Sequence, residues 1–269
     1  MASPPFYADW KFWSVVVSLV AIALSQLPPV HIMLRRAKLD IDVYSRIVIN
    51  HKVGNPNAQL HLILSNIGGR ILKIRSISLR FRRGIEDDFT LPAQNYFQQP
   101  ADKESVLLTS FKLKPNDEWG HVVNFLNLFS RTEDKEYRKI ESDLRNDILN
   151  KLNVQKQLEE QLSQDDPIAK IDRTIHSTSS DYVIASDDKV QPALAFFDKK
   201  FRWMPGEYSM TLEVKAEPPS ASITKQFRVT IFETDSNELR EFREDYKYGA
   251  GIYFDIPKHS GLILPLSNS

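Results

Sequence analysis

Apolar and polar residues alternate with a period of two along much of this 269-residue chain. The pattern begins at residues 39–49, where leucine, isoleucine and valine take most of the odd positions. A strand with one buried face has this spacing, because successive side chains point to opposite faces of a sheet. Similar runs follow at 60–64, 72–81, 107–113, 119–125, 208–216 and 223–231. About seven short strands separated by turn residues indicate a mainly β protein, an antiparallel β-sandwich.

Details of the alternation predict how the strands are joined. Residues 54–57 and 66–69 have turn composition. Leu72 and Ile74 occupy even positions, whereas Ile77, Leu79 and Phe81 occupy odd ones. This change of phase near Arg75 and Ser76 predicts a β-bulge or a change of sheet. Residues 208–216 and 223–231 are expected to pair as an antiparallel hairpin.

A helical pattern interrupts the strands from about residue 131 to residue 200. Within 132–164, apolar residues recur at spacings of three and four. They are Tyr137, Ile140, Leu144, Ile148, Leu152, Leu158 and Leu162. The polar stretch 163–189 is predicted to be loop, and 192–201 leads back to the sandwich. We expect this insertion to pack on its own sandwich; the alternative is a helix that binds a partner.

The extension at about 236–266 changes character again. Residues 237–246 are charged and prone to helix formation, with Ser236 as the expected N-cap. Gly249 and Gly251 should end that helix, and the alternation of Ile252, Phe254 and Ile256 predicts a final strand. Residues 262–266 should pair with it or cover a sheet edge.

Near the start of the chain, Phe12–Leu34 holds no charged residue. As a helix this window would be roughly 35 Å long, enough to cross a hydrocarbon core of about 30 Å. We therefore predict one N-terminal transmembrane helix, with Trp10 and Trp13 at the membrane interface. A kink or an end is expected at Pro28-Pro29. A cleaved signal peptide and a buried helix are the alternatives.

The charges beside the window predict its orientation. Arg35, Arg36 and Lys38 follow it at the interface and Lys11 precedes it, which favours a cytoplasmic C-terminal domain. The chain would then be a single-pass protein of the cell's inner membrane, although the exported orientation stays open. Residues 1–36 form the predicted anchor and 37–269 the predicted folded domain. So short a connection should hold the domain close to the bilayer.

Several local motifs resemble those of bacterial immunoglobulin-like modules. The early ones are the turn Asn66-x-Gly68 and the strand Ile74-x-x-Ile77-x-Leu79. The later ones are Phe111-x-Leu113-x-Pro115 and Pro205-Gly206-x-Tyr208. The resemblance covers residues 39–129 and 201–233, and it implies an immunoglobulin-like β-sandwich that binds proteins or sugars, or acts as a spacer. The paired cysteines of antibody-type domains are missing, so no antibody-like role is implied.

Composition limits the possible chemistry. Lysine and arginine number 35, as do aspartate and glutamate, so the charge balance does not support nucleic-acid binding. The chain has no cysteine, which excludes disulfides, thiol catalysis and cysteine-based metal sites. Its six histidines match no metal-binding motif, and the acidic pairs at 87–88, 165–166 and 187–188 are expected in loops. We predict no catalytic residue, cofactor or metal.

Two groups of surface residues remain as candidates for contact. A basic cluster could dock anionic headgroups if its strand faces the bilayer, or it could be an ordinary outward row of a strand. It comprises Lys73, Arg75, Arg80, Arg82 and Arg83. Tyr96, Phe97 and Trp119 could line a ligand groove or pack in the interior. His61 and His121 fall in predicted strands and are expected on the solvent face or in hydrogen bonds.

The sequence thus favours a membrane-anchored, non-enzymatic interaction or adaptor module. It would belong to a membrane-associated complex, with the lipid bilayer and a protein partner or a second copy as its contacts. The rival hypothesis is a hydrolase or glycan-active enzyme built on the sandwich. A cleft with two converging carboxylates of raised pKa would favour that rival.

Overall fold

The computed structural model describes residues 10–26, 35–84, 87–99, 102, 104–165 and 183–268. Its strands are β1 (Leu39–Lys52), β2 (Asn55–Asn66), β3 (Leu72–Arg83), β4 (Asp87–Phe97), β5 (Val106–Leu107), β6 (Phe111–Leu113), β7 (Glu118–Leu126), β8 (Gly206–Glu217), β9 (Ile223–Ile231), β10 (Leu262–Pro265) and β11 (Ser267–Asn268). Its helices are α1 (Trp10–Gln26), α3 (Arg131–Asp165), α5 (Asp187–Lys200) and α6 (Glu233–Glu241), with short 3-10 turns η2 (Pro219–Ala221), η3 (Phe242–Tyr248) and η4 (Pro257–His259). The mainly β, antiparallel character is therefore confirmed.

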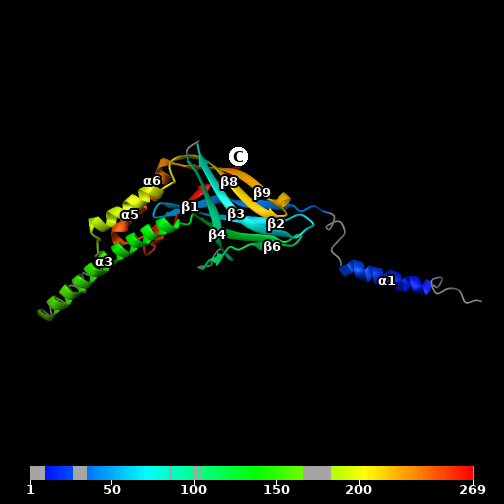
Figure 1. Ribbon diagram of the computed structural model, residues 1–269, viewed down its shortest axis with the longest axis horizontal. Coiled ribbons are helices and arrows are strands. Elements are labelled where there is room, and N and C mark those ends of the chain that lie inside the picture. Colours follow the sequence, from blue (N-terminus) through cyan, green and yellow to red (C-terminus); the bar gives the residue numbers. More distant parts are fainter. Residues whose placement is uncertain are drawn as a thin grey trace, which may run out of the picture.

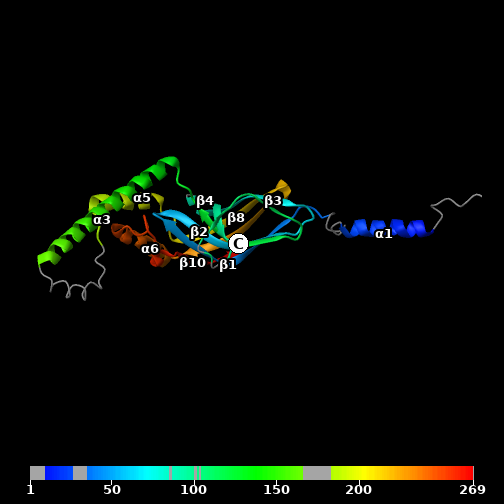
Figure 2. The ribbon, with the colours of Figure 1, turned by 90° about the horizontal axis from the view of Figure 1, so that it is seen from below.

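The strands form one antiparallel sheet that is nearly closed on itself (Figures 1 and 2). Its order is β10-β1-β2-β7-β4-β3-β8-β9-β11. β4 joins the two halves, because residues 87–92 pair with β3 and residues 93–97 pair with β7. At the other side, β10 pairs with β1 while the adjacent β11 pairs with β9. The prediction that residues 262–266 cover a sheet edge is thus confirmed.

The inward rows of the strands form one hydrophobic core. Ile41 and Ile49 of β1, Leu64 of β2, Leu79 of β3 and Leu212 of β8 are completely buried in it. The predicted hairpin of β8 and β9 is confirmed, with Tyr208 opposite Val229. Alternation identified these strands because each has one face on this core and one face outside.

Two irregularities of register show what alternation can reveal. Ile74 lies opposite Ala216 and Ser76 opposite Lys215, so Arg75 is the extra residue of the predicted β-bulge, which is confirmed. In β1, Val43 lies opposite Leu62 but Ile47 opposite Leu60, so β1 carries two extra residues. An even insertion keeps the inward residues on odd positions, and the sequence pattern is unchanged by it.

The first hairpin turn is two residues long rather than the predicted 54–57. Val53 and Gly54 have φ angles of 48° and 80°, the positive values of a type I′ turn. Asn55 already pairs with Lys52 as the first residue of β2. A Cβ atom at Gly54 would lie 2.4 Å from the carbonyl oxygen of Phe197, because α5 packs on this turn.

Two elements were missed in the sequence. Asp87 and Asp88 are not in a loop but begin β4, opposite Arg83 and Arg82. Pro92 lies within this strand and concealed it. Asp187 and Asp188 likewise form the first turn of α5, whose buried residues include Val190, Ala193 and Phe197. Of the third acidic pair, Asp165 ends α3 and Asp166 lies outside the described residues.

The C-terminal extension also differs from the prediction. α6 begins at Glu233, so Ser236 is not its N-cap but a buried residue whose hydroxyl donates to the carbonyl oxygen of Trp203 at 2.8 Å. Gly249 does end the following 3-10 turn, with a φ of 85°. Residues 252–256 form a turn and irregular backbone instead of a strand, with one bridge between Ala250 and Phe254.

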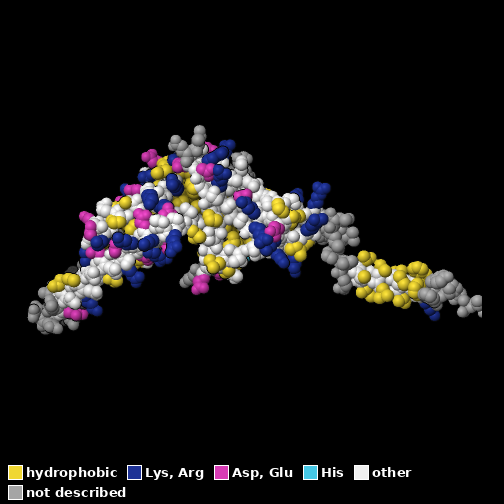
Figure 3. All heavy atoms as spheres, viewed as in Figure 1, with side chains coloured by type: hydrophobic (Ala, Val, Ile, Leu, Met, Phe, Trp, Pro, Cys, Tyr) yellow, Lys and Arg dark blue, Asp and Glu magenta, His cyan; other side chains and the backbone are white. Residues whose placement is uncertain are grey.

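The predicted long helix is confirmed as α3, and only its first half is covered. Tyr137, Ile140, Leu144 and Ile148 are buried where α3 packs on α5. Beyond them the helix projects from the body, with Leu149, Leu152, Val154 and Leu158 exposed (Figures 1 to 3). The insertion therefore packs on the sheet through α5, which contacts β2, whereas α3 packs on α5 instead of on the sandwich as expected, and it presents exposed apolar side chains beyond Ile148.

The N-terminal helix α1 ends at Gln26, and Pro28, Pro29 and His31 of the predicted window lie outside the described residues. Trp10 and Trp13 are exposed in its first turn, next to Phe12. Among the residues that the structure describes, no helix has both the length and the apolar character required to span a membrane.

Candidate functional site

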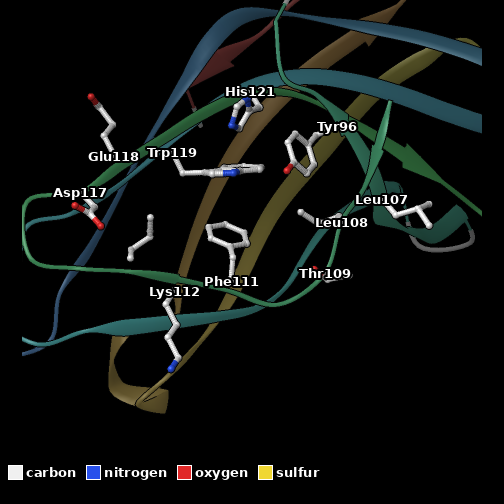
Figure 4. A pocket seen from close by; sticks show the side chains of 11 residues that line it. Tyr96, Leu107, Leu108, Thr109, Phe111, Lys112, Asp117, Glu118, Trp119 and His121 are labelled. Carbon is white, nitrogen blue, oxygen red and sulfur yellow. The ribbon is translucent and has the colours of Figure 1, made fainter. Parts of the chain in front are cut away.

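A cavity of about 450 Å³ opens between the segment that contains β5 and β6 and the start of β7 (Figure 4). We call it the aromatic groove. Four rings form its wall: Tyr96, Phe111, Trp119 and His121. Leu107, Leu108, Thr109, Lys112, Leu113, Asp117 and Glu118 complete the lining.

The groove lies where an inward-facing row of β7 reaches an opening in the sheet. Trp119 and His121 lie on the same face of β7 as Val123 and Phe125, both of which are buried in the core. The pairing of β4 with β7 ends at Val122, so within the described chain residues 118–121 have a strand neighbour, β2, on one side only. β6 likewise pairs with β3 and with no other described strand. Two strand edges without a recorded pairing therefore border the groove.

The four rings hold one another in place. Phe111 stacks on Trp119 with ring centroids 4.8 Å apart and planes at 28°. Tyr96 and His121 meet Trp119 edge to face at 5.3 and 4.7 Å. The Nδ1 atom of His121 also lies 3.2 Å from the carbonyl oxygen of Gln98. These half-buried rings form a wall before any ligand arrives, which lowers the entropic cost of binding.

The rim of the groove is partly apolar and partly charged. Leu107 is 75 % exposed, and its neighbour Val106 is exposed as well. Asp117 is held in its turn, where the carboxylate accepts a hydrogen bond from the backbone N–H of Lys114 at 2.8 Å. Glu118 accepts one from the hydroxyl of Ser65 at 3.2 Å. The arrangement is suited to contact with an apolar side chain.

Some residues of the aromatic groove were predicted from the sequence and others were missed. Tyr96 and Trp119 were candidates for a groove, and the structure brings them together. Phe97 does not line it. His121 faces the groove and also makes the expected hydrogen-bond contact, with Gln98. Phe111 and Leu107 were missed as site residues; the consecutive apolar residues 106–108, which break the alternation, were the available signal. His61 lies on the outer face of β2, as expected.

The predicted basic cluster is largely neutralised by neighbouring carboxylates. The guanidinium of Arg75 donates to Glu217 at 2.7 Å, and that of Arg80 donates to both oxygens of Asp88. This bond holds the pKa of Asp88 below its usual value. Arg83 pairs with Asp87 and also donates to the carbonyl oxygen of Pro205 at 2.8 Å. Of the five predicted residues, Lys73 and Arg82 are the two without a recorded salt bridge in the described chain.

The predicted interface residues lie on two separate segments. Trp10 and Trp13 are on α1, and Arg35, Arg36 and Lys38 are exposed just before β1. The carbonyl oxygen of Arg36 accepts a hydrogen bond from the backbone N–H of Gly69 at 3.3 Å. A Cβ atom at Gly68 would lie 2.5 Å from that oxygen, so this segment packs directly on the turn between β2 and β3.

One buried ionisable group was also missed. His51 continues the inward row of Ile47 and Ile49, and that row was the signal for its burial. Its Nε2 lies 2.7 Å from the carbonyl oxygen of Leu239, and the backbone N–H of Gly54 donates to Nδ1 at 3.2 Å. Burial among Phe197, Phe201 and Phe242 lowers its pKa from 6.5 to about 4. Both contacts fit the neutral imidazole, whose role is structural.

Comparisons with family models, curated proteins and solved structures gave no match to this chain. Within the described residues, no three histidine, aspartate or glutamate side chains are grouped so as to hold a metal ion.

Proposed function

We propose that this protein is a membrane-anchored, non-enzymatic interaction module whose aromatic groove binds an extended segment of a partner polypeptide. The observation that carries the proposal is the preformed wall of Tyr96, Phe111, Trp119 and His121 between two strand edges. An extended segment can pair with such an edge through its backbone and place an apolar side chain on the rings. The immunoglobulin-like character of the fold is part of this proposal, on the motifs that resemble those modules.

The anchor is proposed from the sequence window at residues 12–34. Its apolar length, the tryptophans before it and the basic residues after it are typical of a single membrane crossing. Because residues 36–38 pack on the turn at Gly68 and Gly69, the connection leaves little free chain between the window and the folded body. We propose the inner membrane as the location, with the body on the cytoplasmic side.

The rival hypothesis, a hydrolase or glycan-active enzyme, receives less support. Of the described residues that line the groove, Asp117 and Glu118 are the ones with carboxylates, and each is held by its own hydrogen bond. Among the residues that the structure describes, the carboxylates with a clearly shifted pKa are Asp88, Glu133 and Asp147, and all three shifts are downward. A general acid needs a shift in the opposite direction.

The proposal is tested by a substitution at the rim of the groove. Leu107→Glu places a charge on an exposed apolar residue of the groove, and Ile263→Glu makes the same change on an exposed residue of β10. Each full-length protein is purified from its native membrane in mild detergent. We expect the wild type and Ile263→Glu to retain a stoichiometric partner and Leu107→Glu to lose it.

Two outcomes would count against the proposal. Recovery of the wild type as a lone monomer in repeated preparations would contradict the proposal that the protein is an interaction module. Retention of the partner by Leu107→Glu would show that the partner binds at a place other than the aromatic groove.

A further inference from the structure

A second cavity, of about 140 Å³, lies on the outer face of the sheet, away from the aromatic groove. We call it the amide cleft. Its polar residues are Asn50, Asn57, Gln59, Asn124 and Ser260, and its apolar ones include Val48 and Leu126. No lysine, arginine, aspartate or glutamate is among the residues that line it.

Strand register brings the amide side chains together. Asn50 of β1 lies opposite Asn57 of β2, and Gln59 of β2 lies opposite Asn124 of β7. They are on the outer face because their neighbours Ile49, Ala58 and Leu60 point into the core. Ser260 adds a wall from the segment that leads into β10.

Most of the hydrogen-bonding capacity in the cleft is unused. Asn50 is partly used, because its amide donates to the carbonyl oxygen of His259 at 2.8 Å and accepts from the backbone N–H of His51 at 2.7 Å. Asn124 is 8 % exposed, and its Nδ2 donates to Asn95, but its Oδ1 is buried without a donor. The side chains of Asn57, Gln59 and Ser260 make no recorded hydrogen bond with the described residues.

A buried acceptor without a donor destabilises the folded state, and a ligand that supplies the donor removes that cost. Gln59 lies opposite Asn124 and is exposed, so its side chain can change rotamer when a ligand hydroxyl group approaches Oδ1 of Asn124. Carboxamides both donate and accept, as sugar hydroxyl groups do, and Val48 and Leu126 can contact the C–H groups of a sugar ring. A cavity of this size has room for about five water molecules, which the hydroxyl groups of one ring would replace.

We propose that the amide cleft binds one ring of a neutral sugar. A charged ligand is disfavoured, because no opposite charge is present to compensate for its desolvation. The proposal does not depend on the aromatic groove, since the two sites share no residue.

Saturation-transfer difference NMR of the full-length chain in detergent micelles tests sugar binding by the amide cleft. The detergent must lack a sugar headgroup, because a glucoside or maltoside would compete with the probes. The probes are glucose, galactose, mannose, N-acetylglucosamine and the charged sugar glucuronate. We expect a saturable signal from at least one neutral probe, and binding of glucuronate that is weaker by about tenfold or more. The double variant Asn57→Ala/Gln59→Ala should lose the signal, whereas Gln226→Ala, which removes an exposed amide from β9, should keep it.

The proposal is overturned if no neutral probe gives a saturable signal, or if glucuronate binds as well as the neutral sugars. Equal binding by the double variant and the wild type would overturn it too. Circular dichroism of both variants shows that each is folded, so that a lost signal reports on the cleft.

Discussion

The carboxylate of Asp147 on α3 accepts two hydrogen bonds from Ser186, the residue that precedes α5. The backbone N–H of Ser186 donates to one oxygen at 2.7 Å, and its hydroxyl donates to the other at 3.1 Å. The bond from the backbone is the main cause of the lowered pKa of Asp147. This pair joins the two helices of the insertion beside Ile148, a buried residue of α3.

Replacing Asp147 should therefore loosen the insertion. Asp147→Ala leaves the N–H and hydroxyl of Ser186 without their acceptor, and we expect a loss of about 1–2 kcal/mol in the free energy of unfolding. Urea denaturation measures it. Asp143→Ala, an exposed aspartate one turn earlier on α3, is the control and should cost much less. Equal losses in the two variants would show that the contact to Ser186 contributes nothing.

His51 should make the stability of the protein depend on pH. Its pKa is lower in the folded state, about 4, than its ordinary value of 6.5, so in acid the unfolded chain binds a proton that the folded chain does not. The free energy of unfolding is highest above pH 6.5 and should fall between pH 6.5 and 4, by at most about 3 kcal/mol. Urea denaturation at several pH values measures this fall.

Two variants separate this effect from other titrations. His51→Gln removes the titrating group, so the fall between pH 6.5 and 4 should become smaller even though the variant is less stable at neutral pH. His61→Gln changes a histidine on the outer face of β2 and should keep the fall. An unchanged pH profile for His51→Gln would contradict the assignment.

Replacing Gly54 with alanine should destabilise the protein more than the same change at Gly84, which also has a positive φ angle. Gly54→Ala adds a Cβ atom 2.4 Å from the carbonyl oxygen of Phe197, so the turn and α5 must separate. Gly84→Ala, at a φ of +62°, meets no atom within 4 Å and carries only the backbone cost of about 1–2 kcal/mol. Thermal unfolding should show a clearly larger loss for Gly54→Ala. Equal losses would mean that the contact with α5 is easily relaxed.

The far end of α3 should be dispensable for folding. The nitrogen Nζ of Lys151 lies 2.9 Å from the carbonyl oxygen of Ile184, so a short Gly-Ser linker can replace residues 153–181. Because Ile148 is the last buried residue among the side chains of α3 that the structure describes, we expect the free energy of unfolding to change by less than about 1 kcal/mol. Cooperative urea unfolding of the shortened chain checks this. Loss of the cooperative transition would show that the removed part stabilises the body.

The proposed orientation can be tested cleanly because the chain has no cysteine. Thr224→Cys places one thiol on an exposed residue of β9, and Ser3→Cys places one before the apolar window. With intact cells, a maleimide that cannot cross membranes should label Ser3→Cys and leave Thr224→Cys unlabelled until the cells are permeabilised. The reverse result would place the body outside the cytoplasm.

The sequence predicted those strands that have one face on the core and one outside. It missed β4, because Pro92 and the side chains of that strand, most of them half-buried or exposed, give no clear alternation. It missed α5 for a related reason, since Pro192 lies inside the helix and breaks the expected pattern. β4 and α5 form because of their packing against neighbouring elements, which the local sequence pattern does not show.

The groove was predictable only in part. Trp119 and His121 share their face of β7 with Val123 and Phe125, and by pattern alone all four belong to the interior. Trp119 and His121 are more exposed than Val123 and Phe125 because β4 pairs with β7 only from Val122 onward in the described chain. The place where β4 separates from β7 is decided by tertiary structure. Alternation identifies the face on which a side chain lies, but not the place where the sheet opens.

The pairing of β10 with β1 and of β11 with β9 has a consequence for the order of assembly. β1 is among the first strands to leave the ribosome, while the segment that covers its outer edge comes from the far end of the described chain. Throughout synthesis the nascent sheet therefore displays two uncovered edges, which other chains can pair with. Protection from aggregation would come only with the last strands, and until then it would depend on chaperones or on fast synthesis.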